Sequence, residues 1–144
     1  AFLTDVQKSL LFNRFHIEII LKKNFSVNKQ SDFVIIHNFG FGNINMTAEV
    51  VKYIPVKELV IREKPANRSS KGFNHEIKFE VLKENKHTIL IYSVSGTYGG
   101  RVQDIPFKPI LKGVLKEEII RIKNAIEASE SLPGNIKVGH ISTW

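Results

Sequence analysis

Residues 73–96 of the chain read FNHEIKFEVLKENKHTILIYSVSG. Apolar and polar side chains alternate through the first half of this stretch, which is the two-residue period of a strand with one buried face. Polar residues 83–86 interrupt the pattern, and a second strand-like run follows at residues 88–94. Two strands joined by so short a polar segment are typical of an antiparallel hairpin. The stretch therefore predicts a pair of antiparallel strands.

Residues 110–128, ILKGVLKEEIIRIKNAIEA, have instead the period of a helix. Large aliphatic residues recur at steps of three and four, which places them on one helical face: Leu111, Leu115, Ile119, Ile122 and Ile126. Charged side chains occupy the other faces. Because an apolar stripe of this size is stable only when it is buried, we expect this helix to pack on a sheet.

The middle of the chain carries further strand signals. Three segments, residues 32–41, 45–53 and 56–64, have the alternation or the β-branched composition of strands and are separated by glycine or proline. Pro55 predicts a tight reversal between the last two segments. Together with the hairpin and the helix, they indicate an α+β fold in which a curved antiparallel β-sheet grips a long C-terminal α-helix.

The first part of the chain is less clearly patterned. Thr4 and Gln7 resemble a capping box, which favours a short helix at residues 5–13. Residues 15–22 are rich in β-branched residues and fit a helix or a strand equally well.

Length and composition favour one domain. The chain has 144 residues, 42% of them hydrophobic, enough for a single core. We expect a single domain over residues 1–144, with the core fold at residues 33–128 and a short flexible tail at residues 129–144. The absence of cysteine excludes disulfides and thiolate catalysis. With no signal-peptide pattern and no apolar run of about 18 residues, we expect a cytoplasmic protein.

The order of strands, the segments VKYIPVKELVIREKP (51–65) and KHTILIYSVSGTYGG (86–100), and the closing helix resemble START-like (SRPBCC, Bet v 1-type) helix-grip domains. The resemblance covers about residues 33–128. It implies a sheet that curls around the helix and leaves an apolar cavity for lipids, polyketides, hormones or other hydrophobic ligands.

Such a cavity would be lined by the inward residues of the strands and the helix. The expected lining is His37, His75, Ile77, Phe79, Ile91, Leu115 and Ile119, with Tyr98 and Arg101 near the rim. Arg101 has the guanidinium geometry to bind the carboxylate or phosphate of an amphipathic ligand.

Two candidate sites have simpler structural interpretations. His37 and His75 could be metal ligands, acid–base groups or ligand hydrogen-bond partners, but satisfied histidines in the core or at its rim are the interpretation we favour. A metal would need Glu58 or Glu49 brought near by the fold, so no metal or other cofactor is predicted.

Gly96, Gly99 and Gly100 beside Arg101 could bind a phosphate. A closely packed strand end explains these glycines more simply.

The charge leaves the partner open. The net charge of +7 is compatible with nucleic acid, anionic lipid or an anionic small ligand. The basic residues are scattered along the chain, whereas nucleic-acid binders more often concentrate them. The sequence therefore predicts binding of a hydrophobic or amphipathic small molecule. The alternatives are a basic interaction or nucleic-acid-binding module with a filled core, and a cyclase or hydrolase of the same fold.

Overall fold

The computed structural model of the chain describes residues 2–40, 42–67, 72–96, 107–129 and 136–138. A 3₁₀ turn and a short helix precede six strands, a long helix and a last short strand. The elements are η1 (Phe2–Thr4), α1 (Val6–Leu10), β1 (His16–Ile20), β2 (Asp32–Asn38), β3 (Asn43–Ile54), β4 (Glu58–Pro65), β5 (His75–Glu84), β6 (His87–Gly96), α3 (Phe107–Ser129) and β7 (Ile136–Val138).

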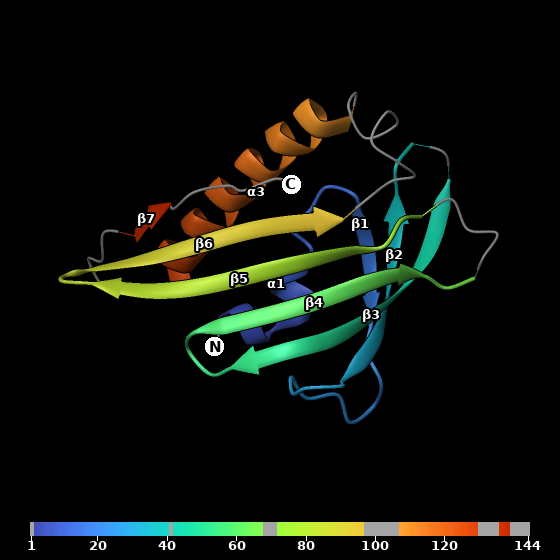
Figure 1. Cartoon of the computed structure of the whole chain (residues 1–144), viewed down its shortest axis with the longest axis horizontal. Helices are drawn as coiled ribbons and strands as arrows, with labels where there is room; N and C mark the ends of the chain where they lie inside the picture. The colour runs from blue at the N-terminus through green and yellow to red at the C-terminus, as the bar shows by residue number, and fades with distance from the viewer. Residues whose placement is uncertain (1, 41, 68–71, 97–106, 130–135, 139–144) are drawn as a thin grey trace.

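The strands form one sheet in which each strand lies beside its neighbour in sequence. Strands β1 to β6 are antiparallel, and β7 adds to β6 in parallel, within the segment expected to be a tail. The sheet is strongly curled, so that β1 and β2 run steeply across the direction of β5 and β6 (Figure 1). The hairpin is present over its whole length, because β5 pairs with β6 from His75–Gly96 to Glu84–His87. The predicted α+β fold is thereby confirmed.

Both helices pack on the same face of this sheet. Val6 and Leu10 of α1, and Leu115, Ile119 and Ile122 of α3, belong to one buried cluster with the inward residues of the strands. Helix α3 runs beside β6, and α1 lies behind β4 and β5 (Figure 1). The apolar stripe on α3 is therefore buried as its spacing predicts.

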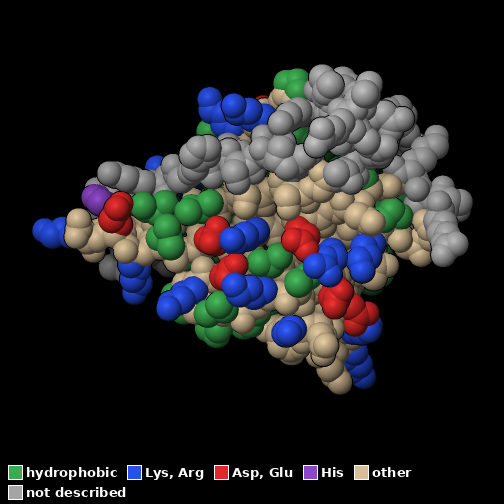
Figure 2. Space-filling view, viewed as in Figure 1, with side chains coloured by type: hydrophobic (Ala, Val, Ile, Leu, Met, Phe, Trp, Pro, Cys, Tyr) green, Lys and Arg blue, Asp and Glu red, His purple; other side chains and the backbone are tan. Residues whose placement is uncertain are grey.

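The opposite face of the sheet is charged. Arg62 on β4 donates two hydrogen bonds to Glu76 on β5, at 2.8 and 2.6 Å. Lys78 Nζ lies 3.6 Å from Glu58 Oε1 and 3.0 Å from Glu80 Oε1. Figure 2 shows basic and acidic side chains interspersed over this surface. Such cross-strand pairs suit a solvated face, which leaves the inner face to hold the core.

Several boundaries differ from the expected ones. Helix α3 begins at Phe107, so Pro109 lies in its first turn, where a missing N–H costs no helical hydrogen bond. Helix α1 is shorter than expected and is capped by Asp5, whose Oδ1 accepts from Lys8 N at 3.3 Å; Thr4 is not the cap. The ambiguous segment after α1 forms strand β1.

The predicted reversal at Pro55 has an unusual residue at its third position. Lys57 N donates to Ile54 O at 3.0 Å, which closes a four-residue turn. Val56 has φ 63°, as the third residue of a type II turn requires. A β-branched residue is disfavoured in this left-handed region. Strand β4 starts directly after this turn, at Glu58, two residues later than expected.

Replacing Val56 by glycine should therefore stabilise the protein. Val56 is 76% exposed, so the change removes little packing and relieves a left-handed β-branched residue. We expect a net gain of about 1 kcal/mol in the free energy of unfolding, after allowance for the greater freedom of glycine in the unfolded chain. Urea denaturation measures this change in the free energy of unfolding. Lys57→Gly, at a residue with negative φ, should instead destabilise; equal effects of the two variants would contradict the strain at Val56.

Candidate functional site

Four ionisable side chains meet in the interior: His16 from β1, His37 from β2, Glu63 from β4 and His75 from β5. We call them the histidine–glutamate cluster. Sheet register brings them together, because His16 lies opposite His37 and Glu63 lies opposite His75. All four are buried, and Glu63 is completely so, at 0% exposed.

The ring nitrogens of the cluster converge on one carboxylate. His37 Nε2 donates to Glu63 Oε2 at 2.7 Å. His75 Nε2 lies 3.3 Å from the same oxygen, and His16 Nε2 lies 3.8 Å from Glu63 Oε1. Each of the three histidines thus directs its Nε2 atom toward Glu63.

Backbone carbonyl groups orient two of these rings from behind. His16 Nδ1 donates to Leu10 O at 2.7 Å, and His75 Nδ1 donates to Phe73 O at 3.0 Å. A carbonyl oxygen can only accept, so the proton of each ring sits on Nδ1. In the neutral form, Nε2 of His16 and of His75 then carries a lone pair that faces the carboxylate.

Gly96 allows the backbone of β6 to approach His75. A Cβ atom at Gly96 would lie 2.5 Å from Asn74 O and 2.6 Å from His75 Cβ. Both distances are shorter than a carbon side chain tolerates. The close-packing interpretation of this glycine, made from the sequence, agrees with its surroundings, whereas Gly99 and Gly100 lie outside the described residues.

The members of the histidine–glutamate cluster have their pKa values shifted in different directions. Burial opposes ionisation of Glu63, but the surrounding histidines outweigh burial and hold the pKa of Glu63 well below its usual range. Burial lowers the pKa of His16 to about 4, and attraction to Glu63 offsets this only in part. For His75, burial also lowers the pKa, yet the charge and hydrogen bond of Glu63 prevail, so the pKa is raised. At neutral pH the carboxylate is therefore ionised and His16 is neutral.

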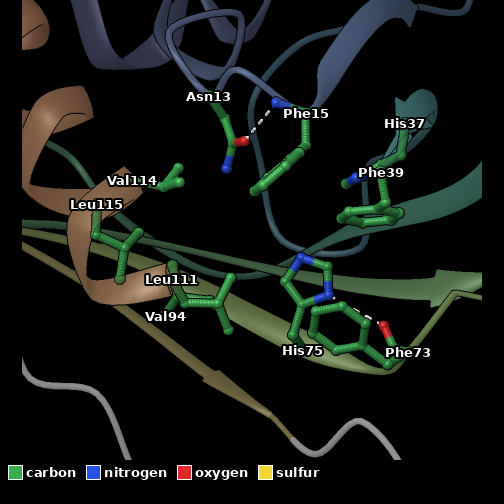
Figure 3. Close-up of a pocket in the computed structure, with 10 residues that line it drawn as sticks. All are labelled: Asn13, Phe15, His37, Phe39, Phe73, His75, Val94, Leu111, Val114 and Leu115. Carbon is green, nitrogen blue, oxygen red and sulfur yellow. Dashed lines mark hydrogen bonds between the residues drawn. The ribbon is translucent and has the colours of Figure 1, made fainter. Parts of the chain in front are cut away.

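A pocket of about 30 Å³ adjoins the cluster (Figure 3). His37 and His75 lie at one side of it among phenyl rings, with centroids 5.2 Å apart for His37 and Phe39 and 4.8 Å apart for Phe73 and His75. The remaining lining residues are Asn13, Phe15, Val94, Leu111, Val114 and Leu115. The wall is thus aromatic beside the histidines and mostly aliphatic where α3 and β6 meet.

A second buried polar pair joins the sheet to α3. Tyr92 on β6 donates from its hydroxyl to Glu118 Oε1 at 2.9 Å. Burial raises the pKa of Glu118 to about 8; the Tyr92 hydrogen bond and the charge of Arg121 oppose this rise, and the charge of Glu63 adds to it. Glu118 is therefore mostly protonated at neutral pH, while Glu63 is ionised. Two carboxyl groups in one interior hold opposite protonation states, an arrangement found where acid and base roles are divided.

The residues expected to line a cavity do not all meet at this pocket. His37, His75 and Leu115 line it. Ile77, Phe79 and Ile119 pack in the core cluster and are not among the lining residues. Tyr98 and Arg101 lie outside the described residues.

Ile91 was assigned to the wrong face of its strand. The buried residues of β6 are Leu90, Tyr92 and Val94, and Tyr92 lies opposite the inward Phe79. Ile91 lies opposite Glu80, on the charged outer face, and is not part of the pocket.

The carboxylates considered for a metal site also lie elsewhere. Glu58 pairs with Lys52 and Lys78 on the outer face. Glu49 alternates with the buried Ala48 and Val50 and therefore faces outward.

Sequence reasoning missed four residues of the polar interior: His16, Glu63, Tyr92 and Glu118. Glu63 is in phase with Leu59 and Ile61 along β4, so its inward position was readable from the alternation. Glu118 follows Leu115 by three residues and therefore lies on the apolar side of α3. A carboxylate in phase with core residues was the available signal in both cases.

Comparison of the chain with protein-family models, with curated proteins and with solved structures gives no match to any of them. Among the described helices, none is long and apolar enough to cross a membrane. The function must therefore be inferred from the geometry of the site.

Glu118→Gln should remove a pH dependence of stability. The folded pKa of Glu118 is about 8, above the usual value of 4.5, so its contribution to stability is full below about pH 4.5 and is lost as the pH rises through 8. Glutamine keeps an oxygen for Tyr92 and cannot ionise. We expect the variant to match the wild type near pH 4.5 and to exceed it by on the order of 4 kcal/mol at pH 8, measured by urea unfolding.

The matched control is Glu117→Gln. Glu117 is exposed and lies 3.7 Å from Arg121, so its removal should change stability by no more than about 0.5 kcal/mol at any pH. A pH-independent difference between Glu118→Gln and the wild type would contradict the raised pKa.

Proposed function

We propose that this chain is a small-molecule-binding domain of the helix-grip type, related to the START-like domains. Its ligand is amphipathic, with a planar apolar part and a compact polar end. The observation that carries the proposal is the aromatic-walled pocket that ends on the buried His37 and His75. A pocket with apolar walls, a few convergent polar groups and shifted pKa values is the usual form of a ligand site.

The aromatic wall supports a planar ligand. Phe15 precedes β1, Phe39 follows β2 and Phe73 precedes β5, so three separate segments each supply one phenyl ring. Ring centroids are 5.2 Å apart for Phe15 and Phe39 and 6.0 Å apart for Phe39 and Phe73. All three side chains are only partly buried. Rings that retain exposed surface around a pocket can stack on an aromatic guest.

The small volume of the pocket determines which end of the ligand can enter it. A space of about 30 Å³ admits a water molecule or a polar group of similar size, and no lipid tail. Beyond the pocket, Ile77, Phe79 and Ile119 fill the interior. The polar end therefore points toward the histidines, and the apolar part lies along the phenyl rings. The pairing of Arg101 with an anionic ligand group stays a prediction.

His37 offers a hydrogen bond for the polar end. Its Nδ1 atom has no partner among the described residues, while its Nε2 is bonded to Glu63. A hydroxyl group both donates and accepts, so it suits this nitrogen whether the imidazole is neutral or protonated. An aromatic alcohol or phenol is thus the ligand class that matches the pocket best.

The outer face does not favour the nucleic-acid alternative. On this face Arg62 and Lys78 are each paired with carboxylates, and Figure 2 shows no continuous basic tract over the described sheet. Binding to phosphates requires cations that are free to replace counterions. The small-molecule proposal therefore has the stronger support.

A fluorescent aromatic alcohol tests the proposal. We expect 1-naphthol to bind the wild type with a saturable change in emission, and Val114→Trp to weaken binding about tenfold or more, because the indole fills the pocket. Ile120→Trp places the same ring on an exposed position of α3 that does not line the pocket. It should bind as the wild type does. No binding, or equal binding by Val114→Trp, would exclude the pocket as the ligand site.

A further inference from the structure

His16, His37 and Glu63 have the composition and spacing of a metal site. One ligand atom from each lies within 4.8 Å of the other two, and all three residues are buried. Two imidazoles and one carboxylate suit zinc and the other divalent metals of the first transition row. Three protein ligands also leave a position open for water or substrate, as in catalytic sites.

The hydrogen bond behind His16 matches those of metal-binding histidines. Such histidines donate their second ring N–H to a carbonyl or carboxylate, which fixes the tautomer and aims the lone pair at the metal. His16 does this through Leu10 O, and its Nε2 lone pair faces Glu63. His37 borders a pocket large enough for a water molecule, which would serve its Nδ1 in the same way.

Two buried atoms in the cluster face each other without a hydrogen-bond partner among the described residues. They are His16 Nε2 and Glu63 Oε1, 3.8 Å apart. Both are acceptors when His16 is protonated on Nδ1, so they cannot satisfy each other. An unsatisfied buried polar group destabilises the folded state, and a cation between the two atoms would coordinate both lone pairs.

The three ligand atoms, all within 4.8 Å of one another, would have to adjust to the spacing of one ion. Two ligands of a tetrahedral ion, with bonds of about 2.0–2.2 Å, lie about 3.3–3.6 Å apart. The separation of His16 Nε2 and Glu63 Oε1 is 3.8 Å, slightly longer. His37 Nε2 is 2.7 Å from Glu63 Oε2 because a proton joins them. A metal that displaces this proton would lengthen the contact.

We propose that His16, His37 and Glu63 bind one divalent transition-metal ion, with His75 as a positioning residue that holds the Glu63 carboxylate from 3.3 Å. Of the three proposed ligands, His37 also lines the pocket. This inference does not rest on the small-molecule proposal, because His16 is not among the pocket-lining residues.

Direct metal titration tests the site. The full chain without a histidine tag, stripped by a chelator and desalted, is titrated with Zn²⁺ by calorimetry and with Co²⁺ by visible absorption. We expect one ion per chain and the visible bands of four- or five-coordinate Co²⁺. His16→Gln and Glu63→Gln should each lower Zn²⁺ affinity about 100-fold or more, and His75→Gln about 10-fold. Zn²⁺ should raise the melting temperature of the wild type.

His87→Gln is the matched control. His87 opens β6 and lies outside the cluster, so its replacement should leave the stoichiometry and affinity unchanged. Val114→Trp should likewise retain the metal while losing 1-naphthol, which separates failure of this proposal from failure of the ligand proposal.

NMR of the wild type tests the metal site even if the variants do not fold. In long-range ¹H–¹⁵N spectra of the imidazoles, Zn²⁺ should change the ¹⁵N chemical shifts of Nε2 of His16 and of His37. The shifts of His87 should stay unchanged. Absence of saturable binding at one ion per chain would overturn the proposal. So would unchanged affinity in folded His16→Gln and Glu63→Gln, or imidazole shifts confined to residues outside the cluster.

Discussion

The buried carboxylate of Glu63 is the constraint on which the interior depends. A carboxylate with no exposed surface is stable only when neighbouring groups compensate its charge. The compensation comes from β2 and β5: His37 donates a hydrogen bond to Glu63, and attraction to Glu63 raises the pKa of His75, whereas His16 of β1 packs against the carboxylate as a neutral ring. A slip of one residue in any of these strands would turn a partner to the outer face. Removing one partner of a buried pair typically costs about 3–5 kcal/mol, so the cluster also specifies the register of the sheet.

The same interior holds a second carboxyl group in the opposite state. Glu118 has only the Tyr92 hydroxyl as a donor, and its Oε2 atom has no hydrogen-bond partner among the described residues. Burial therefore dominates at Glu118 and keeps the proton on it, whereas at Glu63 the histidines dominate. Environment alone, with the same side-chain type, produces a fixed negative charge and a buried proton donor within one small core.

His37 and His75 connect the cluster to the outside, because they belong both to the carboxylate network and to the pocket wall. A ligand of the proposed kind would contact histidines that Glu63 and the backbone already orient. Gly96 contributes by its small size, since any side chain there would displace His75. Binding at the pocket, as proposed, would therefore be coupled to the electrostatics of the core through these two rings.

The sequence alone determined the hairpin, the amphipathic helix and the antiparallel order of strands, because each leaves a local period of two or of 3.6 residues. It placed His37 and His75 on inward faces for the same reason. Only tertiary structure decided which side chains meet, since His16 and Glu63 lie on strands distant in sequence and joined by register. It also decided which face of the sheet Ile91 occupies. Residues 89–92 are all apolar, so their sequence does not show which of them point inward. The pairing of Tyr92 with the inward Phe79 does show it.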